Sequence, residues 1–320
     1  MTHALLFERE DVAEVDDWRE QIPRLRRSSI LWIDLERPDE KEIRSLVEQL
    51  DLSEESAKQL ADRECRPRLR DHGTYIHATV CAVRNERRRE LEPVECLVSK
   101  QWVVTVHDSS LEVLETFRER AAGFGDIGRL DGGLFLADLV EWVLAGYLEA
   151  FERIEQDLDE VDARAMQRRV RNTEGALEEL VDVRREIGRI RRALSSHREV
   201  LLALARPEID AITTTESSGR FAELVVRLEE AMQAARDSRE SVVGSFDVLI
   251  ASTSQRTNEI MKVLTLASVL LLPGSLIAAV LGMNFQVGFF EQTGLFWVTI
   301  ALIAGIIVAT VGIARAKRWI

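Results

Sequence analysis

The sequence predicts an α+β membrane protein, in which an N-terminal α/β domain is followed by a long helical stalk and two C-terminal transmembrane helices. Short β-rich and helical runs alternate over about the first 125 residues, and long helical patterns follow from Leu134. Near the C-terminus, Val263–Leu281 and Leu295–Ala314 contain no charged residue. Each is close to the ~20 apolar residues that a helix needs to cross about 30 Å of hydrocarbon.

The N-terminal domain, residues 1–130, is expected to build its own core. Strands are predicted at His3–Phe7, Ile30–Leu35, Thr74–Val83, Val94–Val98 and Trp102–His107. Helices are predicted at Asp39–Leu50, Ser53–Glu64 and Leu111–Ala122. The arginine-rich connection Arg84–Leu91 should be solvated, and Gly132-Gly133 indicates a linker.

Composition and motifs argue against an enzyme and against a nucleic-acid partner. The formal net charge is −13, whereas nucleic-acid-binding proteins usually present a basic face. No phosphate loop, zinc-protease motif or nucleophile elbow is present, so we expect no organic cofactor. Neither the cysteines nor the N-terminal histidines have the spacing of metal ligands. The cysteines are expected to be free thiols: Cys65, Cys81 and Cys96. The histidines are expected to lie in the core or on the surface: His72, His77 and His107.

Residues 131–262 are expected to form a cytoplasmic helical stalk. Two helical runs, Leu134–Arg169 and Asn172–Arg206, precede a run from Glu216 that continues into the first span. A continuous helix of that length would measure on the order of 100 Å at ~1.5 Å per residue, so it must project into an aqueous phase. The two shorter helices are expected to pack antiparallel beside it.

One face of this long helix is small or polar. Two neighbouring rows at heptad spacing make up this stripe: Asp247, Ser254, Met261, Ser268, Ser275 and Gly282, and beside them Ala251, Asn258, Thr265, Leu272 and Ala279. In lipid, such residues belong at helix contacts or along a water-filled path. Close packing alone would explain serine and alanine, whereas Asp247 and Asn258 favour a path. Because two spans cannot enclose a pore, a path requires a homo-oligomer.

The distribution of charge predicts the orientation in the cell membrane. The first span is assigned to 263–284, the outer loop to 285–294, the second span to 295–314 and a basic tail to 315–320. The loop carries only the acidic Glu291, while basic residues flank the spans on the other side: Lys262, Arg315, Lys317 and Arg318. By the positive-inside rule, both termini of this multi-pass protein are cytoplasmic.

The first span ends in Gly282-Met283-Asn284, at its predicted outer end. Mg²⁺ gives up its hydration water reluctantly. One Asn284 amide from each subunit would accept hydrogen bonds from that hydration shell, and Gly282 lets the backbone turn or approach closely. The alternative is a glycine helix stop followed by a loop.

Taken together, these residues resemble the CorA family of divalent-cation channels, also called two-TM-GxN proteins. The resemblance spans nearly the whole chain. It rests on Asn258-Glu259, Met261–Thr265, Pro273, Gly282–Phe285 and the tail Lys317–Ile320, with Trp32–Leu35 and the Val98–Val106 hairpin upstream.

The resemblance implies a funnel-shaped homopentamer with an αβα cytoplasmic domain and a pore lined by the first span. Gly282, Met283 and Asn284 would form the outer selectivity filter, at which Asn284 meets the ion. Asp247 and Asn258 match funnel and pore positions, and Met261 and Leu264 match a hydrophobic constriction. The implied pore-lining set is Asp247, Ser254, Asn258, Met261, Leu264, Thr265, Ser268, Leu272, Ser275 and Ala279.

The resemblance also implies regulation by the transported ion. In the best-known members, cytoplasmic Mg²⁺ binds acidic residues between subunits and holds the pore shut. Glu223 stands where an aspartate of that site would be, so it is a candidate regulatory ligand, as is Asp247. The longer reach of glutamate is a departure from the family pattern.

The expected function is uptake of a divalent cation, with Mg²⁺ as both substrate and regulatory ligand and with other copies of the chain and membrane lipid as partners. The outer loop lacks the Met-Pro-Glu segment common in magnesium channels, and the intact Met283 favours magnesium over zinc. Two alternatives stay open. One is a Zn²⁺, Co²⁺ or Ni²⁺ transporter on the same scaffold, with or without proton coupling. The other is a membrane-anchored oligomeric sensor or scaffold.

Overall fold

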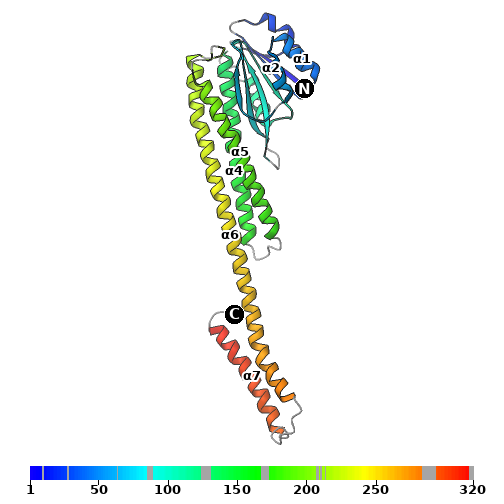
Figure 1. The fold of residues 1–320 in the computed structure, drawn as a ribbon, viewed down its shortest axis with the longest axis vertical. Coiled ribbons are helices and arrows are strands. Elements are labelled where there is room, and N and C mark those ends of the chain that lie inside the picture. Colours follow the sequence, from blue (N-terminus) through cyan, green and yellow to red (C-terminus); the bar gives the residue numbers. More distant parts are fainter. Residues whose placement is uncertain are drawn as a thin grey trace. The chain divides into compact units, whose positions relative to one another are not determined.

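The computed structural model describes most of the chain, and Figure 1 shows its helices and strands. The described residues are 1–8, 11–26, 29–62, 64–84, 89–123, 131–166, 173–206, 209, 211–212, 214–282 and 293–316. They form two compact units. The first comprises Met1–Arg164 and Glu174–Phe246, and the second comprises Ala165–Thr173 and Asp247–Ile320.

The described strands of the first unit form one mixed, seven-stranded sheet in the order β2-β1-β3-β7-β6-β5-β4. They are β1 (Thr2–Glu8), β2 (Asp11–Glu14), β3 (Ile30–Glu36), β4 (Arg68–Asp71), β5 (Ile76–Arg84), β6 (Glu90–Val98) and β7 (Trp102–His107). Among these described strands, only β3 and β7 pair in parallel. The longer strands confirm the predicted ones. The sequence does not predict β2 and β4, because these edge strands are short and polar.

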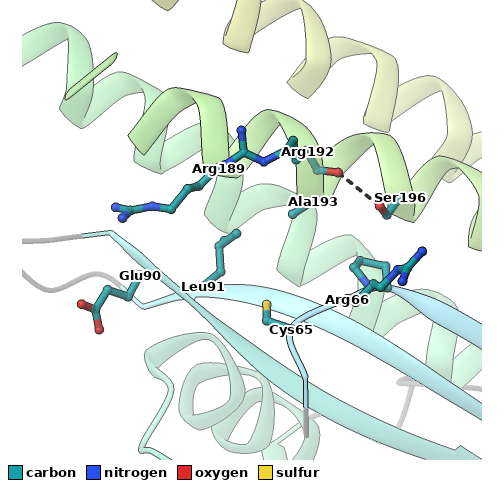
Figure 2. A pocket seen from close by; sticks show the side chains of 9 residues that line it. Cys65, Arg66, Glu90, Leu91, Arg189, Arg192, Ala193 and Ser196 are labelled. Atoms are coloured by element: carbon teal, nitrogen blue, oxygen red, sulfur yellow. Dashed lines mark hydrogen bonds between the residues drawn. The ribbon is translucent and has the colours of Figure 1, made fainter. Parts of the chain in front are cut away.

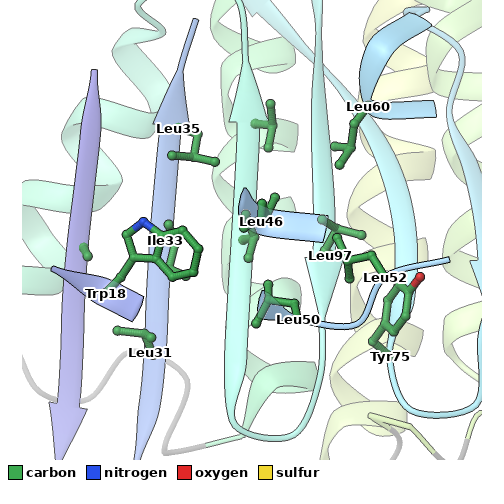
Figure 3. Close-up of a cluster of buried hydrophobic side chains, with 13 residues drawn as sticks. Trp18, Leu31, Ile33, Leu35, Leu46, Leu50, Leu52, Leu60, Tyr75 and Leu97 are labelled. Atoms are coloured by element: carbon green, nitrogen blue, oxygen red, sulfur yellow. The ribbon is translucent and has the colours of Figure 1, made fainter. Parts of the chain in front are cut away.

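Helices α1 (Glu40–Gln49) and α2 (Glu54–Asp62) supply a hydrophobic core on one face of the sheet (Figure 3). Leu46 and Leu60 of these helices are fully buried in the same cluster as Ile33 and Leu97 of the sheet. The start of α1 is fixed by Asp39, whose carboxylate accepts hydrogen bonds from the N–H groups of Lys41 and Glu42.

The opposite face of the sheet carries an aromatic core. Trp32 of β3 packs against Phe117 of α3 (Glu112–Gly123) and Phe135 of α4 (Gly132–Met166), with ring centroids 5.4 and 5.2 Å apart. All three rings are fully buried, and their tilted and edge-on contacts are the favoured aromatic geometries. With helices on both faces, the N-terminal domain is the αβα layer structure that was expected.

Helices α4, α5 (Thr173–Leu204) and α6 (Thr215–Gly282) pack side by side in the first unit (Figure 1). Ion pairs on their surface join neighbours: Arg164 to Glu179 at 2.8 Å between α4 and α5, and Arg198 to Glu229 at 2.7 Å between α5 and α6. These exposed pairs contribute little energy, and the buried apolar faces hold the bundle together. The predicted packing of two shorter helices against a long one is confirmed within this unit.

A polar contact ties α4 and α5 to the edge of the sheet. Pairing between β4 and β5 ends at Thr79, so the peptide groups of Cys81 lie beyond the last β4 partner. The Cys81 N–H donates to His197 Nε2 at 3.1 Å, and the Cys81 carbonyl accepts from the Tyr147 hydroxyl at 2.7 Å. His197 Nδ1 donates to the Ala193 carbonyl at 2.9 Å, so the imidazole is neutral. Side chains thereby satisfy buried backbone groups that a strand would otherwise pair.

Arg89 corrects the expectation that the whole Arg84–Leu91 connection is solvated. Its side chain is buried, and its guanidinium bonds Glu186 of α5 at 3.1 Å and Asp157 of α4 at 2.7 Å. A buried arginine requires such partners, because an unpaired charge would lose its hydration without compensation. The neighbouring residues 85–88 lie outside the described part of the chain.

Gly132-Gly133 is the start of α4 and not a linker. The carboxylate of Asp131 accepts from the Gly133 N–H at 2.7 Å and caps the helix. A Cβ atom on Gly132 would lie 1.9 Å from the carbonyl oxygen of Ser99, which belongs to the turn between β6 and β7. Glycine is required here because two backbone segments come into direct contact.

The histidines confirm the expectation of core or surface roles. His77 bonds the buried Glu95 carboxylate at 3.0 Å, and His107 bonds Asp34 at 3.2 Å. His72 lies at 3.2 Å from the Ser56 hydroxyl. Within the described residues, no group of three or more His, Cys, Asp or Glu side chains is arranged to hold a metal ion.

We expect His197 to make the first unit sensitive to acid. Burial lowers the pKa of His197 to about 4 from its ordinary value of 6.5. As the pH falls, His197 is therefore protonated in the unfolded chain before it is protonated in the folded chain. The contribution of neutral, buried His197 to the free energy of unfolding is complete above pH 6.5 and is lost between pH 6.5 and pH 4. The loss amounts to about 3 kcal/mol.

Urea unfolding of the full chain in detergent, followed by tryptophan fluorescence at pH 7 and pH 4, measures this loss. His197→Gln keeps an acceptor for the Cys81 N–H and cannot titrate. Its stability should fall less than that of the wild type over the same interval. An identical pH dependence in both proteins would contradict the assignment.

Gly132→Ala should destabilise the first unit by roughly 1–3 kcal/mol, because the new methyl group overlaps the Ser99 carbonyl. Gly146, also on α4, has nothing within 4 Å of an added Cβ. Gly146→Ala is the matched control and should stabilise the helix by up to about 1 kcal/mol. Equal unfolding midpoints in urea for the two variants would refute the close contact.

Candidate ion pathway along α6

The second unit brings together the C-terminal part of α6 and helix α7 (Thr293–Ala316). Within the part of the chain that the structure describes, two helices are long and apolar enough to cross a membrane: α6, over a window within Thr215–Val280, and α7, over Trp297–Ala316. The two predicted spans are therefore helical throughout their described residues.

Helix α7 packs along one face of α6. A Cβ atom on Gly274 would lie 3.4 Å from Ile303 Cγ2, so the two helices approach closely at this glycine. Apart from the half-buried Ser268, the partly or fully covered residues of the two spans recur every three or four positions, as on one side of a helix. They are Leu266, Leu270, Pro273, Gly274 and Ile277 on α6, and Thr299, Ile303, Ile306, Thr310 and Ala314 on α7. We call the former set the α7 face of α6.

The predicted stripe lies on the opposite side of α6. Ser268 and Ser275 each stand two residues before Leu270 and Ile277, which at about 100° per residue is roughly half a turn around the helix. Ser268 is half-buried, and the other predicted pore-lining residues are exposed in the single chain: Asp247, Ser254, Asn258, Met261, Leu264, Thr265, Leu272, Ser275 and Ala279. The side of α6 that carries the stripe is therefore left uncovered by α7.

Two serines of the stripe, Ser268 and Ser275, donate their hydroxyl protons to carbonyl groups of their own helix. Ser268 Oγ donates to the Leu264 carbonyl at 2.9 Å, and Ser275 Oγ donates to the Leu272 carbonyl at 3.0 Å. A free hydroxyl proton would be costly in a hydrocarbon environment, and this arrangement removes that cost. The oxygen lone pairs remain available as acceptors. Water bound to a cation directs its hydrogens outward, so such acceptors suit a hydrated ion.

The outer end of the stripe falls outside the described residues. Met283, Asn284 and Glu291, which sequence reasoning assigns to the filter and the outer loop, are not among them. Gly282 is the last residue of α6, and it is exposed with nothing within 4 Å of an added Cβ. The selectivity filter therefore stays a prediction.

Glu223, the candidate regulatory ligand, lies in a network with arginines. Arg220 Nη1 donates to Glu223 Oε2 at 2.9 Å, and Arg220 also forms ion pairs with Asp138, at 3.9 Å, and with Glu141 of α4. Arg227 bonds Glu141 as well. Sequence reasoning missed the two α4 carboxylates. The sequence does carry a signal for the pairing of Glu223 with an arginine, because Arg220 stands three residues before it on one helix, a spacing that favours an ion pair.

The chain resembles known proteins over most of its length. A family model described as a CorA-like Mg2+ transporter protein matches residues 27–315. The "Cobalt/magnesium transport protein CorA" of Thermotoga maritima is 25% identical over 241 residues, which cover 74% of this chain and 67% of that protein. The "Putative metal ion transporter YfjQ" of Bacillus subtilis is 25% identical over 290 residues, 87% of each.

Solved structures share the fold. The complete structure of the CorA magnesium transporter from Methanocaldococcus jannaschii matches with a TM-score of 0.78 at 20% identity, covering 99% of this chain and 98% of that one. The structure of the full-length CmaX protein matches with a TM-score of 0.74 at 20% identity, covering 99% of this chain and 97% of that one. The ZntB cytoplasmic domain from Vibrio parahaemolyticus matches with a TM-score of 0.57 at 12% identity, covering 79% of this chain and 98% of that one. The likeness includes the αβ domain, the long helix and the two apolar helices.

If the stripe faces other copies of the chain, a cysteine placed on it should crosslink between copies. We expect Ser275→Cys to give covalent oligomers with a short dithiol crosslinker in liposomes. Ile277→Cys is the matched control, because it lies on the α7 face, and it should give none. Both variants carry Cys65→Ser, which removes the exposed thiol and leaves Cys81 and Cys96 buried. Equal crosslinking at both positions would contradict this orientation of α6.

Proposed function

Because this chain belongs to the CorA-like Mg2+ transporter family, we propose that it carries a divalent cation, and Mg²⁺ in particular, into the cell. The observation that carries the proposal is the small and polar stripe of α6, which lies on the side opposite the α7 face. A helix that only anchored a sensor in the membrane would not need Asn258, Thr265, Ser268 and Ser275 in line. Transport is thus a better account of this stripe than anchoring.

The path requires several copies of the chain. The stripe of one chain can line only one side of a path through the membrane. Among the described residues, the uncovered side of α6 has no partner within its own chain. We propose a funnel-shaped homopentamer in which five stripes surround the axis. The exposed apolar residues of α7, such as Val298, Val308 and Ile313, would then face membrane lipid.

The proposed topology follows the charges that flank the spans. Residues 1–130 and the stalk 131–262 would be cytoplasmic, with the first span at 263–284, an outer loop at 285–294 and the second span at 295–314. The tail 315–320 would return to the cytoplasm. An inside-negative potential of 100 mV favours entry of a dication by about 4.6 kcal/mol, so no ATP hydrolysis is required.

Selection is assigned to Gly282, Met283 and Asn284. Five Asn284 amides at the outer mouth would accept hydrogen bonds from the ion's bound water without stripping it, which suits an ion that dehydrates reluctantly. Met261 and Leu264 would form an apolar constriction near the cytoplasmic end of the span. Glu291 would be the acidic group of the outer loop that attracts cations.

Gating is assigned to cytoplasmic Mg²⁺. Glu223, and Asp247 further along α6, are the proposed regulatory ligands. Because Glu223 accepts a hydrogen bond from Arg220, a cation bound there would compete with that guanidinium. Loss of Mg²⁺ from such sites at subunit interfaces would return Glu223 to Arg220 and, by leaving the carboxylates to repel one another, loosen the closed arrangement.

Ion flux into liposomes that contain the purified full chain tests the function. Mg²⁺, Zn²⁺, Co²⁺ and Ni²⁺ are compared, with and without a pH gradient. Voltage-driven Mg²⁺ entry that ignores pH is the expected result. Zn²⁺ entry that follows the proton gradient would support a zinc transporter on the same scaffold. An absence of flux for all four ions would reject transport.

Asn284→Ala should reduce Mg²⁺ flux to about a tenth of the wild-type rate or less, because the ring of amide acceptors is lost. Size-exclusion chromatography should show an unchanged oligomer. Asn284→Gln keeps the amide on a longer side chain and should retain more flux than alanine. Wild-type flux in a correctly assembled Asn284→Ala protein would exclude Asn284 from the filter.

A further inference from the structure

A pocket of about 620 Å³ lies between α5 and the strands β4 and β6 in the first unit (Figure 2). Arg189, Arg192 and Ala193 of α5 line it on one side. Leu91 of β6 lies opposite, together with Cys65 and Arg66, which precede β4. Its volume falls within the range of roughly 300–1,000 Å³ that is typical of small-molecule sites.

The pocket concentrates positive charge in a protein whose net charge is −13. Among the residues that the structure describes, no carboxylate forms an ion pair with Arg66, Arg189 or Arg192. The acidic residue of the lining, Glu90, already bonds Arg84 at 2.5 Å. Three guanidinium groups therefore keep hydrogen-bond donors that no carboxylate of the described residues occupies.

The nearest buried carboxylate is engaged elsewhere as well. Glu186 stands one turn before Arg189 on α5, and it accepts a hydrogen bond from Arg89 at 3.1 Å. Arg189 is exposed and extends over the pocket on the side of Glu90 (Figure 2). Arg189 interacts electrostatically with Glu186, but no ion pair on its own helix holds its guanidinium, which extends to the side of the pocket where Glu90 lies (Figure 2).

The arrangement of the arginines indicates an extended anion. Figure 2 shows Arg189 and Arg66 on opposite sides of the pocket, while the Arg192 side chain runs back along α5, where its Nη1 would lie 3.7 Å from a Cβ atom on Gly188. A single phosphate cannot contact groups that are spread around a rim, whereas a chain of phosphates can. Leu91 and the buried Ala193 provide an apolar surface between the arginines. Such a surface suits an organic group attached to the phosphates.

We propose that this pocket binds a soluble organic polyphosphate of the nucleoside triphosphate type. Guanidinium groups bind phosphate oxygens through paired N–H donors, and they do so better than lysine because their geometry matches. The sequence contains no phosphate loop, so recognition rests on arginine side chains and not on backbone amides. The ligand would connect α5 with β6 and with the segment before β4.

Cys65 provides a reporter for occupancy. It lines the pocket and is exposed, whereas Cys81 and Cys96 are buried. Hydrogen bonding with the Cys65 thiol and burial raise the pKa of Cys81, and burial raises the pKa of Cys96, so both stay as unreactive thiols. A maleimide dye should therefore label Cys65 selectively, and Cys65→Ser should abolish labelling.

The test measures labelling of the full chain in uncharged detergent without added lipid, in the presence of ATP. We expect ATP to slow labelling of the wild type. Arg189→Gln with Arg192→Gln should weaken this protection, raising the ATP concentration required by about 10- to 100-fold. Arg191→Gln is the matched control, because Arg191 is exposed on α5 and does not line the pocket. It should leave protection unchanged. Arg66→Gln tests the opposite rim independently.

Four results would overturn the proposal. The first is that ATP does not protect the wild type, and the second is that ATP protects the double variant and the Arg191→Gln control equally. The third is that inorganic phosphate, added in place of ATP, protects as well as ATP does. The fourth is that protection is seen only when vesicles of anionic lipid replace ATP. The readout is binding and not flux, so failure here leaves the proposed transport function untouched.

Discussion

The close approach of α7 to α6 at Gly274 decides which side of the long helix is free. In hydrocarbon, every backbone polar group must be paired within the protein, so each span has to be a complete helix, and its side chains alone distinguish one face from another. Helix α7 takes the apolar side of α6 and leaves Ser268 and Ser275 on the other. A side chain that extends beyond Cβ at 274 would push the helices apart and blur this division, because a Cβ there is already in van der Waals contact with Ile303.

The first unit depends on polar contacts that connect its layers. Arg89 joins the sheet to α4 and α5 through two carboxylates, while Tyr147 and His197 join the same helices to the backbone of Cys81. Buried polar groups of this kind specify one arrangement of the layers, since any shift leaves a donor or an acceptor without a partner. Apolar packing alone would tolerate small displacements between helix and strand.

The sequence predicts the elements whose signal is local. Alternating Val and Ile runs identify the inner strands, and the heptad pattern of α6 identifies the stripe that the structure then leaves uncovered. It does not identify contacts made by distant segments. Nothing near Arg89 shows that it is the buried arginine of its connection, because Asp157 and Glu186 lie far along the chain. The arginine pocket is missed for the same reason, since Arg66 and Arg189 come to line one pocket only in the folded chain. The filter residues Met283 and Asn284 rest on motif resemblance alone.

The contacts at Cys81 also bear on how copies of this protein can meet. An open sheet edge offers free N–H and C=O groups to a strand of another molecule, which is a route to aggregation. Beyond the end of β4, Tyr147 and His197 already occupy those groups, and the opposite edge is the short, polar strand β2. Extension of the sheet from one molecule into the next is thereby disfavoured beyond the end of β4, and both edge strands, β2 and β4, are short and polar. If copies of the chain associate as proposed, the exposed helix faces are better suited to that contact than these parts of the sheet, and the folding chain is protected there against strand-to-strand misassembly.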